Sequence, residues 1–353
     1  MLFHSAAQLN YDYVIENFAD FQEIQLRVNN STEGESTRYP GAVNGGGFAG
    51  KIFRMINDVD FNYFAWTGIG ATSTTPFKGI LDGDGNAILN LNFTNASTQT
   101  GLFIYLENAT IKNIIIKGDI TNTSTNARAI LSPAVTGTCY FQKIISHVNM
   151  TNGGTCVWTH TTIGTVQNVE DCYNFGNLKA TNTAWAVGMF TATTNGLINA
   201  KRCANFGNLS NNNSTSQTLK IGIFSVDNAV IENCYNAGAI TNRTTSNANL
   251  ISSGVLAGAG GATNFQVHRS YNIGNVTGYQ NSKALIAYPV PAVQSANYHL
   301  STLSPGAGYN GVSKTEAELK SGALFEDRVW IERAGKYPIL PFRIDLQDQY
   351  LNQ

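Results

Sequence analysis

The segment Cys172-Tyr-Asn-Phe-Gly-Asn-Leu178 recurs three times in this 353-residue chain, each time slightly altered. The copies read Cys203-Ala-Asn-Phe-Gly-Asn-Leu209, Cys234-Tyr-Asn-Ala-Gly-Ala-Ile240 and Ser270-Tyr-Asn-Ile-Gly-Asn-Val276. Their first residues are 31, 31 and 36 positions apart. A repeat of this length is typical of a chain that stacks near-identical units, each of which buries its apolar face only against its neighbours.

Each copy follows the frame Cys-x-Asn-x-Gly-x-aliphatic, so small or apolar residues recur at every second position, as on one face of a strand. Weaker copies occur at Ile114–Ile120 and Ile144–Met150. Further short strands are expected at segments such as Val187–Phe190, and immediately before the frame, as at Ala229–Asn233. Turn signals for local hairpins are mostly missing. We therefore predict an all-β chain, folded as a parallel β-helix (β-solenoid) with about three strands per coil.

Residues one repeat apart are then expected to lie directly over one another. The asparagines at the third frame position should form an amide ladder along the axis; they are Asn174, Asn205, Asn236 and Asn272. The cysteines at the first position should form a row of buried thiols; they are Cys172, Cys203 and Cys234. The chain has five cysteines, so at least one cannot pair within it. Whether Cys139 and Cys156 form a disulfide stays open.

Stacked strands leave open edges at both ends, which need covers. Ser5-Ala-Ala-Gln8 has the pattern of a capping box and predicts a helix through about Phe18. Ser313-Lys-Thr-Glu316 has the same pattern and predicts a helix to about Ser321. We expect both segments to plug the ends of one continuous domain. Its expected parts are an N-terminal cap (1–45), a parallel β-helix (46–290) and a C-terminal cap (291–353).

The stretches Gly46–Asp60 and Pro76–Ile88 resemble the opening of GLUG-motif β-helix proteins. The segment Gly101-Leu-Phe103 resembles their repeat, and Tyr337-Pro-Ile-Leu340 resembles their closing motif. The resemblance covers roughly residues 45–342. It implies a right-handed parallel β-helix of the kind found in large bacterial surface or secreted proteins with adhesion roles. No catalytic set accompanies the motif, so the resemblance implies none here.

Charged residues occupy the position two before each frame, in the order Glu170, Lys201, Glu232 and His268. Neighbouring coils would place Glu beside Lys, which predicts ion pairs on a solvated corner, each worth roughly 0–1 kcal/mol. A catalytic pair of Glu170 and Glu232 would be two rungs, or roughly 10 Å, apart, which is wide even for an inverting glycosidase. Lys201 between them would also keep both pKa values low. A structural role is therefore expected.

Other candidate sites are weaker. Asp82-Gly-Asp84-Gly-Asn86 begins like a calcium loop but lacks the downstream Glu of an EF-hand, so a tight turn is expected. Asp58 and Asp60 are expected at a solvated strand end. The five histidines are scattered along the chain (His4, His147, His160, His268 and His299). We therefore expect no catalytic, cofactor-binding or metal-binding residue, and no cofactor.

Aromatic residues near the coil corners are candidate sugar contacts, because an amphipathic ring can stack on a pyranose. They are Trp158, Trp185, Tyr173 and Tyr235, and for each of them packing is the favoured interpretation and sugar contact the alternative. Asn-x-Ser/Thr sequons are only modestly more frequent than chance predicts. They include Asn108, Asn122, Asn242 and Asn275.

Composition excludes several classes of protein. Charged residues make up 13% of the chain and its formal net charge is −1, so it has neither a basic field for nucleic acid nor a polybasic membrane patch. Neither a signal peptide nor an apolar run long enough to span a bilayer is visible. These features favour a non-enzymatic β-solenoid that is extracellular or lies on a cell or virion surface. It would serve as a spacer and adhesive surface for a host-surface glycan or protein, or for neighbouring copies. The alternatives are a polysaccharide-degrading, tailspike-like depolymerase or lyase, and a self-assembling subunit of a fibre or particle.

Overall fold

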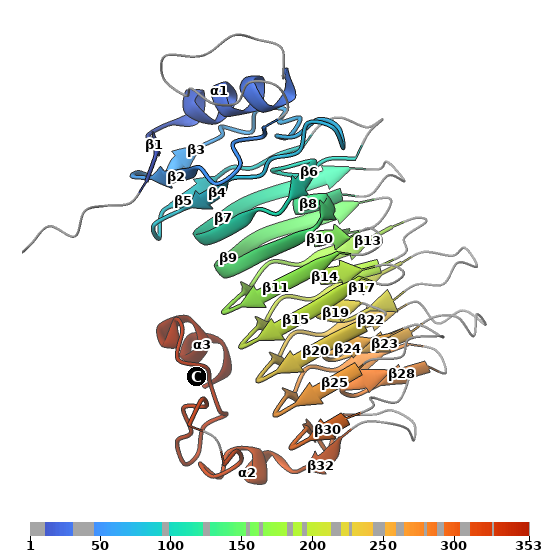
Figure 1. The fold of residues 1–353 in the computed structure, drawn as a ribbon. Coiled ribbons are helices and arrows are strands. Elements are labelled where there is room, and N and C mark those ends of the chain that lie inside the picture. Colours follow the sequence, from blue (N-terminus) through green and yellow to red (C-terminus); the bar gives the residue numbers. More distant parts are fainter. Residues whose placement is uncertain are drawn as a thin grey trace, which may run out of the picture.

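The computed structural model describes residues 11–30, 46–93, 99–122, 128–152, 156–161, 165–181, 186–192, 196–212, 220–225, 228–242, 251–258, 265–278, 281–287, 293–303, 311–326 and 328–352. Over these residues the chain is a parallel β-solenoid with three short helices (Figure 1). Each strand pairs in parallel with its counterpart in the next coil. The predicted all-β fold class is therefore confirmed.

One 22-stranded sheet contains three ladders, which follow one another around the coil. The first ladder stacks β1 (Tyr13–Ile15), β2 (Ile52–Met55), β4 (Ile80–Asp82), β7 (Thr110–Asn122), β9 (Thr138–Asn152), β11 (Val166–Glu170), β15 (Leu197–Lys201), β20 (Asn228–Glu232), β25 (Phe265–His268) and β30 (Val293–Ser295). The second ladder adds β3 (Val59–Asp60), β5 (Ala87–Leu89), β12 (Tyr173–Asn174), β16 (Ala204–Asn205), β21 (Tyr235–Asn236), β26 (Tyr271–Asn272), β31 (Tyr298–Leu300) and β32 (Val312–Lys314). The third adds β13 (Leu178–Ala180), β17 (Leu209–Asn211), β22 (Ile240–Asn242) and β27 (Val276–Thr277). The long strands β7 and β9 contribute to more than one ladder.

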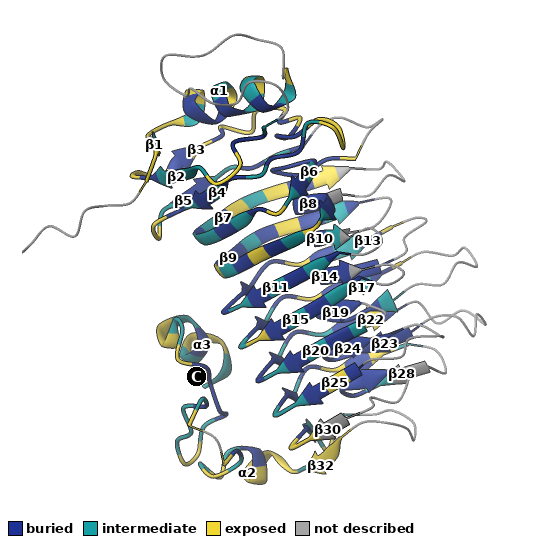
Figure 2. Cartoon of the chain, in the orientation of Figure 1, coloured by how far each residue is buried: buried dark blue, intermediate teal, exposed yellow. Residues whose placement is uncertain are grey.

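A 10-stranded sheet closes the other side of each coil. It consists of β6 (Tyr105–Glu107), β8 (Arg128–Thr136), β10 (Cys156–Thr161), β14 (Ala186–Ala192), β18 (Lys220–Ile221), β19 (Phe224–Ser225), β23 (Ile251–Ser253), β24 (Leu256–Ala257), β28 (Asn281–Lys283) and β29 (Ile286–Ala287). Buried side chains fill the space between the two sheets, while exposed residues lie on outer faces and ends (Figure 2).

The interior rows predicted from the repeat are confirmed. Cys172, Cys203 and Cys234 are fully buried in the core, and the Cys203 backbone N–H donates to Cys234 Sγ at 3.4 Å. Cys139 is also a buried free thiol, so the pairing with Cys156 that the sequence leaves open is not formed. The side chain of Cys156 lies outside the described residues.

The asparagine ladder is continuous through four coils. Asn174 Nδ2 donates to Asn205 Oδ1 at 2.7 Å, and Asn205 Nδ2 donates to Asn236 Oδ1 at 2.7 Å. The ladder continues from Asn236 to Asn272 at 2.8 Å. Each amide also donates to the carbonyl of the frame glycine two residues on, as Asn205 does to Gly207 at 2.7 Å. The third frame position therefore satisfies backbone groups that the corner leaves unpaired.

The frame glycine is required by the close approach of neighbouring coils. A Cβ on Gly207 would lie 1.9 Å from the carbonyl oxygen of Gly176, and one on Gly238 would lie 2.0 Å from that of Gly207. Such distances exclude every larger side chain unless the backbone moves.

The corner between the first and second ladders uses one residue per coil in the left-handed conformation, with φ of 47–55°. These residues are Asn113, Lys143, Asp171, Arg202, Asn233, Arg269 and Ala296. Asn and Asp tolerate this conformation better than most residues, because their short side chains hydrogen-bond locally. The corner directs the next side chain inward, where the row of cysteines begins.

The N-terminal cap is a helix, but a different one from that predicted. Residues 5–8 lie outside the described residues, and Tyr13–Ile15 forms strand β1, paired with β2. Helix α1 spans Phe18–Asn29 and begins at Asn17, whose Oδ1 accepts from the Ala19 N–H at 2.9 Å. The prediction of a helix ending near Phe18 is therefore wrong, because pairing with β2 outweighs the local capping pattern. The buried face of α1, which includes Phe21, Ile24 and Val28, covers the N-terminal end of the core (Figure 1).

The C-terminal segment does not plug the far end. Helix α2 spans Glu316–Leu319 and starts close to the predicted position, with Thr315 rather than Ser313 as its N-cap. The chain then turns back along the side of the solenoid and ends in α3, Ile344–Leu351 (Figure 1). We call residues 315–326 and 328–352 the C-terminal strap.

The strap covers the outward row of the second ladder. Trp330 packs on Tyr235 and Tyr271, with ring centroids 5.9 and 5.4 Å apart, and Phe342 packs on Tyr173 at 5.3 Å. These tyrosines point outward from their strands, and covering them removes a large aromatic surface from water. That gain explains why the segment lies along the side.

The strand ladders also extend beyond the predicted boundaries of the β-helix, 46–290. At one end β1 pairs with β2, and at the other β30, β31 and β32 continue the stack to Lys314. Backbone hydrogen bonds to the exposed edge strands stabilise these additional rungs.

Candidate functional site

The outer face of the first ladder carries a row of polar side chains around one exposed aromatic ring. Tyr140 lies in register with Asn168, which lies in register with Asn199. Asn199 Nδ2 donates to Asn168 Oδ1 at 3.1 Å, and the Tyr140 ring is 43% exposed. A shallow pocket of about 240 Å³ lies over this row. Its lining also includes Gln142, Val169, Glu170 and Lys201.

A second pocket of about 460 Å³ lies at the neighbouring corner. Arg202 is its central charge, and donates to Asp171 Oδ1 at 2.8 Å and also to Glu170. The hydrogen bond to Asp171 raises the pKa of Arg202 above its ordinary value. Besides these three residues the pocket is lined by Lys112, Asn113, Gln142 and Lys143.

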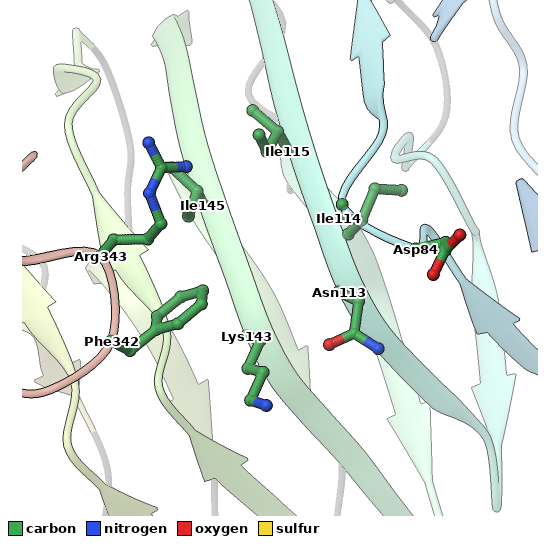
Figure 3. Close-up of a pocket in the computed structure, with 9 residues that line it drawn as sticks. Asp84, Asn113, Ile114, Ile115, Lys143, Ile145, Phe342 and Arg343 are labelled. Atoms are coloured by element: carbon green, nitrogen blue, oxygen red, sulfur yellow. The ribbon is translucent and has the colours of Figure 1, made fainter. Parts of the chain in front are cut away.

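A third pocket of about 360 Å³ lies between the coils and the part of the strap just before α3 (Figure 3). Phe342 and Arg343 come from the strap, while Ile115 and Ile145 are outward residues of β7 and β9. The remaining lining residues are Asp84, Gly85, Asn113, Ile114 and Lys143. Ile115, Ile145 and Phe342 thus make an apolar part of this pocket, beside the Arg343 guanidinium that Asp345 pairs, while Asp84, Asn113 and Lys143 make its polar part.

The three pockets share lining residues and form a continuous surface, which we call the lateral groove. Gln142 and Glu170 line the first and second pockets, and Asn113 and Lys143 line the second and third. The groove crosses β7, β9, β11 and β15, so rigid paired strands position its side chains.

The structure places the predicted row of charges in register. Glu170, Lys201, Glu232 and His268 are successive partners in the first ladder. Lys201 Nζ lies 3.6 Å from Glu232 Oε2, as expected. The partner of Glu170 is Arg202 of the next corner, which the sequence interpretation missed because it considered only residues in register.

The calcium-like loop is a turn closed by ion pairs. Asp84 bonds to Arg54 at 2.5 Å, and Lys112 lies 3.1 Å from Asp82. Burial raises the pKa of Asp82, but hydrogen bonds from Asn113, the Asp84 N–H and Lys112 outweigh it, and the pKa lies below the usual 3.8. These contacts to protein donors occupy both carboxylate oxygens of Asp82 and one of Asp84 in a tight turn.

Asp58 and Asp60 act in local structure. Asp58 Oδ1 accepts from the Ala87 N–H at 2.7 Å, and Asp60 Oδ1 accepts from the Asn62 N–H at 2.7 Å. No group of three His, Cys, Asp or Glu side chains that could hold a metal ion occurs among the described residues. None of the described helices is both long and apolar enough to cross a membrane.

The four histidines that the structure describes do not converge. His147 stacks on Phe175, with ring centroids 5.0 Å apart, and His160 Nδ1 lies 2.8 Å from Thr191 Oγ1. His268 bonds Ser295 in the next coil, and His299 lies near the C-terminal end of the ladder. His4 lies outside the described residues.

The favoured packing interpretation of the candidate aromatics is confirmed for the three that the structure describes. Trp158, Tyr173 and Tyr235 are fully buried, the tyrosines by the strap. Trp185 lies outside the described residues. The exposed ring that the sequence interpretation missed is Tyr140, whose signal was its outward position in the alternating pattern of β9.

The sequons differ in accessibility. Asn108 and Asn275 are exposed, whereas Asn242 is 2% exposed and lies inside the solenoid. The side chain of Asn122 lies outside the described residues.

No family model matches the chain. No curated protein matches it either. Among solved structures, the chain is similar to a protein from Bacteroides ovatus described as a "putative immunoglobulin A1 protease", with a TM-score of 0.55 and 13% sequence identity. The similarity covers 94% of this chain and 92% of that chain. At this identity the likeness shows a shared β-solenoid fold alone, because one fold hosts many functions.

Proposed function

We propose that this protein is a non-enzymatic β-solenoid that acts as a rigid spacer and presents a glycan-binding surface, the lateral groove. The proposed setting is the outside of a cell or a virion, and the proposed partner is a host-surface glycan. The observation that carries the proposal is the exposed Tyr140 ring beside the amides of Asn168 and Asn199, all on paired strands. Rings that stack on sugar faces and amides that bond hydroxyls are common features of sugar recognition.

The rod itself supports the spacer role. Continuous ladders join every described coil to the next, and buried rows such as Asn174–Asn205 add hydrogen bonds along the axis. Such a stack resists bending, because each coil is held by its neighbours on several strands at once.

The enzyme alternative needs a carboxylate that is available for acid, base or nucleophilic chemistry. In the groove Glu170 and Asp171 both bond Arg202, and Asp84 bonds Arg54. Each of these carboxylates is already held by a guanidinium through charge-assisted hydrogen bonds, which leaves it less available to contact a substrate. The arrangement therefore favours binding over turnover.

A glycan array tests the proposal. We expect wild-type protein to bind a subset of glycans, and Tyr140→Ala to weaken that binding by about threefold to tenfold through loss of ring stacking. Tyr63→Ala is the matched control, because the Tyr63 ring is 55% exposed but belongs to the first coils, outside the groove. Release of reducing ends from any polysaccharide would refute the non-enzymatic role, and an array without binding would refute the glycan surface.

A further inference from the structure

We propose that the lateral groove selects acidic glycans, with Lys143 binding the sugar carboxylate and the apolar end of the groove receiving an N-acyl group. This inference rests on the proposed function and names the ligand class of the same surface.

Among the side chains that line the groove, cations outnumber carboxylates, although the net charge of the whole chain is −1. Five cationic side chains line it against three carboxylates, an excess of two. The cations are Lys112, Lys143, Lys201, Arg202 and Arg343, and the carboxylates are those of Asp84, Glu170 and Asp171.

Four of the five cations already have carboxylate partners. Two of these pairs lie within a ladder, Lys112 with Asp82 at 3.1 Å and Lys201 with Glu232 at 3.6 Å. The other two are Arg202 with Asp171 at 2.8 Å and Arg343 with Asp345 at 2.8 Å. These side chains are neutralised locally and offer a ligand carboxylate less attraction.

Lys143 differs, since within the described part of the chain its ammonium has no ion pair. It is exposed, it occupies a corner, and it lines both the second and the third pocket. An anionic ligand in the groove would therefore meet this charge at its centre. An ammonium in such a place recognises a carboxylate through charge-assisted hydrogen bonds.

The apolar end supplies the second element of specificity. Ile115, Ile145 and Phe342 line a pocket of about 360 Å³, within the size range of small-molecule sites. The charge beside them is the guanidinium of Arg343, which Asp345 already pairs. The pocket continues the outward row that the strap covers, since Ile145 lies in register with Tyr173. A small apolar substituent would bury surface there, while hydroxyl groups would face the amides of Asn113 and Gln142.

An acidic sugar with an N-acyl group combines these elements in one ligand. The carboxylate meets Lys143, the acyl methyl group meets the isoleucines, and the neighbouring sugar ring extends towards Tyr140. Free fatty acids lack the hydroxyl groups that the amides of Asn113 and Gln142 would bind. Neutral glycans lack the carboxylate that would pair with the Lys143 ammonium.

Three trisaccharides separate these contributions. They are sialyllactose, the same compound with a hydroxyl in place of the N-acyl group, and its neutral core extended by galactose. We expect affinity to fall in this order, as measured by calorimetry. Lys143→Gln should weaken binding of both acidic ligands about tenfold and leave the neutral one unchanged. Salt of about 1 M, which shortens the Debye length to about 3 Å, should have the same selective effect.

Lys179→Gln is the matched control, because Lys179 lies on β13, outside the groove. Equal binding of acidic and neutral ligands, or acidic binding that ignores Lys143→Gln, would overturn the inference. If Tyr140→Ala abolishes binding of the neutral trisaccharide, the proposed glycan-binding function stands even where the inference about acidic glycans has failed. Binding of acidic peptides but of no glycan on the array would overturn both.

Discussion

Partial burial of one histidine makes the stability of this solenoid depend on pH. His160 is a half-buried residue of β10, with Nδ1 2.8 Å from Oγ1 of Thr191 on the neighbouring strand β14. Desolvation, together with the positive charge of Lys220, lowers the pKa of His160 from 6.5 to about 4. The folded pKa is the lower one, so between these two values the unfolded chain binds a proton that the folded chain does not. Stability must therefore fall as the pH falls through this window.

When the pH falls from about 7 to about 4.5, we expect the free energy of unfolding of the wild type to fall by about 1–3 kcal/mol more than that of His160→Gln. Urea unfolding at both pH values measures the difference. His299→Gln controls for loss of an imidazole, since His299 lies on β31, in the last but one rung of the second ladder and away from His160. Equal pH sensitivity in all three proteins would contradict the assignment to His160.

The thiols show a related effect of burial. Desolvation raises the pKa of the Cys139 thiol to about 11, and raises that of Cys172 and Cys234 well above its ordinary 9.0. For Cys203 between them, desolvation acts in the same direction, but hydrogen bonds from Cys172 and Cys234 outweigh it and lower the pKa to about 5. All three thiols of the row are fully buried, and a thiol that no reagent can reach does not act as a nucleophile whatever its charge. The row therefore contributes packing rather than chemistry, as its place in the sequence repeat predicts.

Among the elements, the polar ladder inside the solenoid sets the register of the strands. Asn205 bonds Asn174, Asn236 and the Gly207 carbonyl, each at 2.7 Å and away from water. Deleting one amide leaves several buried partners unsatisfied, which costs more than the deleted bonds contribute. A slip in register by one residue would disrupt the whole row, so the ladder also opposes misaligned coils.

We expect Asn205→Ala to lower the free energy of unfolding by about 2–4 kcal/mol. Asn208→Ala is the control. Asn208 Oδ1 also accepts from the next coil, at 3.1 Å from the Ala239 nitrogen, but it does so in water, and should cost less than about 1 kcal/mol. Chemical denaturation compares the two variants. Similar losses of unfolding free energy in the two variants would contradict the prediction, because the buried ladder would then stabilise the fold no more than an exposed hydrogen bond does.

For the whole molecule, one buried amide near the C-terminal end of the strap adds to the aromatic contacts that hold it on the solenoid. Gln347 is fully buried, and its Oε1 accepts from Tyr235 Oη at 2.8 Å and from the Leu340 N–H at 2.8 Å. Its Nε2 donates to the Leu340 carbonyl at 2.8 Å. The side chain thus joins α3, the preceding loop and the second ladder.

We expect Gln347→Ala to open the strap locally, at a cost of about 2–4 kcal/mol, because Tyr235 and Leu340 lose their partners. Hydrogen exchange followed by mass spectrometry should show faster exchange in residues 328–352 and unchanged protection in β11 and β15. Gln25→Ala, which removes bonds to Thr67 and Gly68 at the other end, is the control. Faster exchange throughout the solenoid would mean that the strap is part of its folding unit.

Part of this architecture could be predicted from the sequence because it depends on residues one repeat apart. Cys172, Asn174 and Gly176 recur in the same frame as their partners in the next coil, so a single period predicts the stack, the inward rows and the register of Glu170 with Lys201. The same alternation correctly predicts that Tyr173 points outward from its strand. Local capping patterns were less informative, since pairing with β2 makes a strand of residues that the Ser5–Gln8 pattern predicts as helix.

The linear repeat by itself determined a parallel β-solenoid, because strand pairing one period apart is encoded in similar residues at similar spacing. Only the tertiary structure decided which outward rings meet solvent. Tyr173 and Tyr235 are buried by a strap whose Gln347 is 174 and 112 residues away, whereas Tyr140 stays exposed in the lateral groove. The strap docks by shape and hydrogen bonding between dissimilar segments, and no periodicity records such a contact.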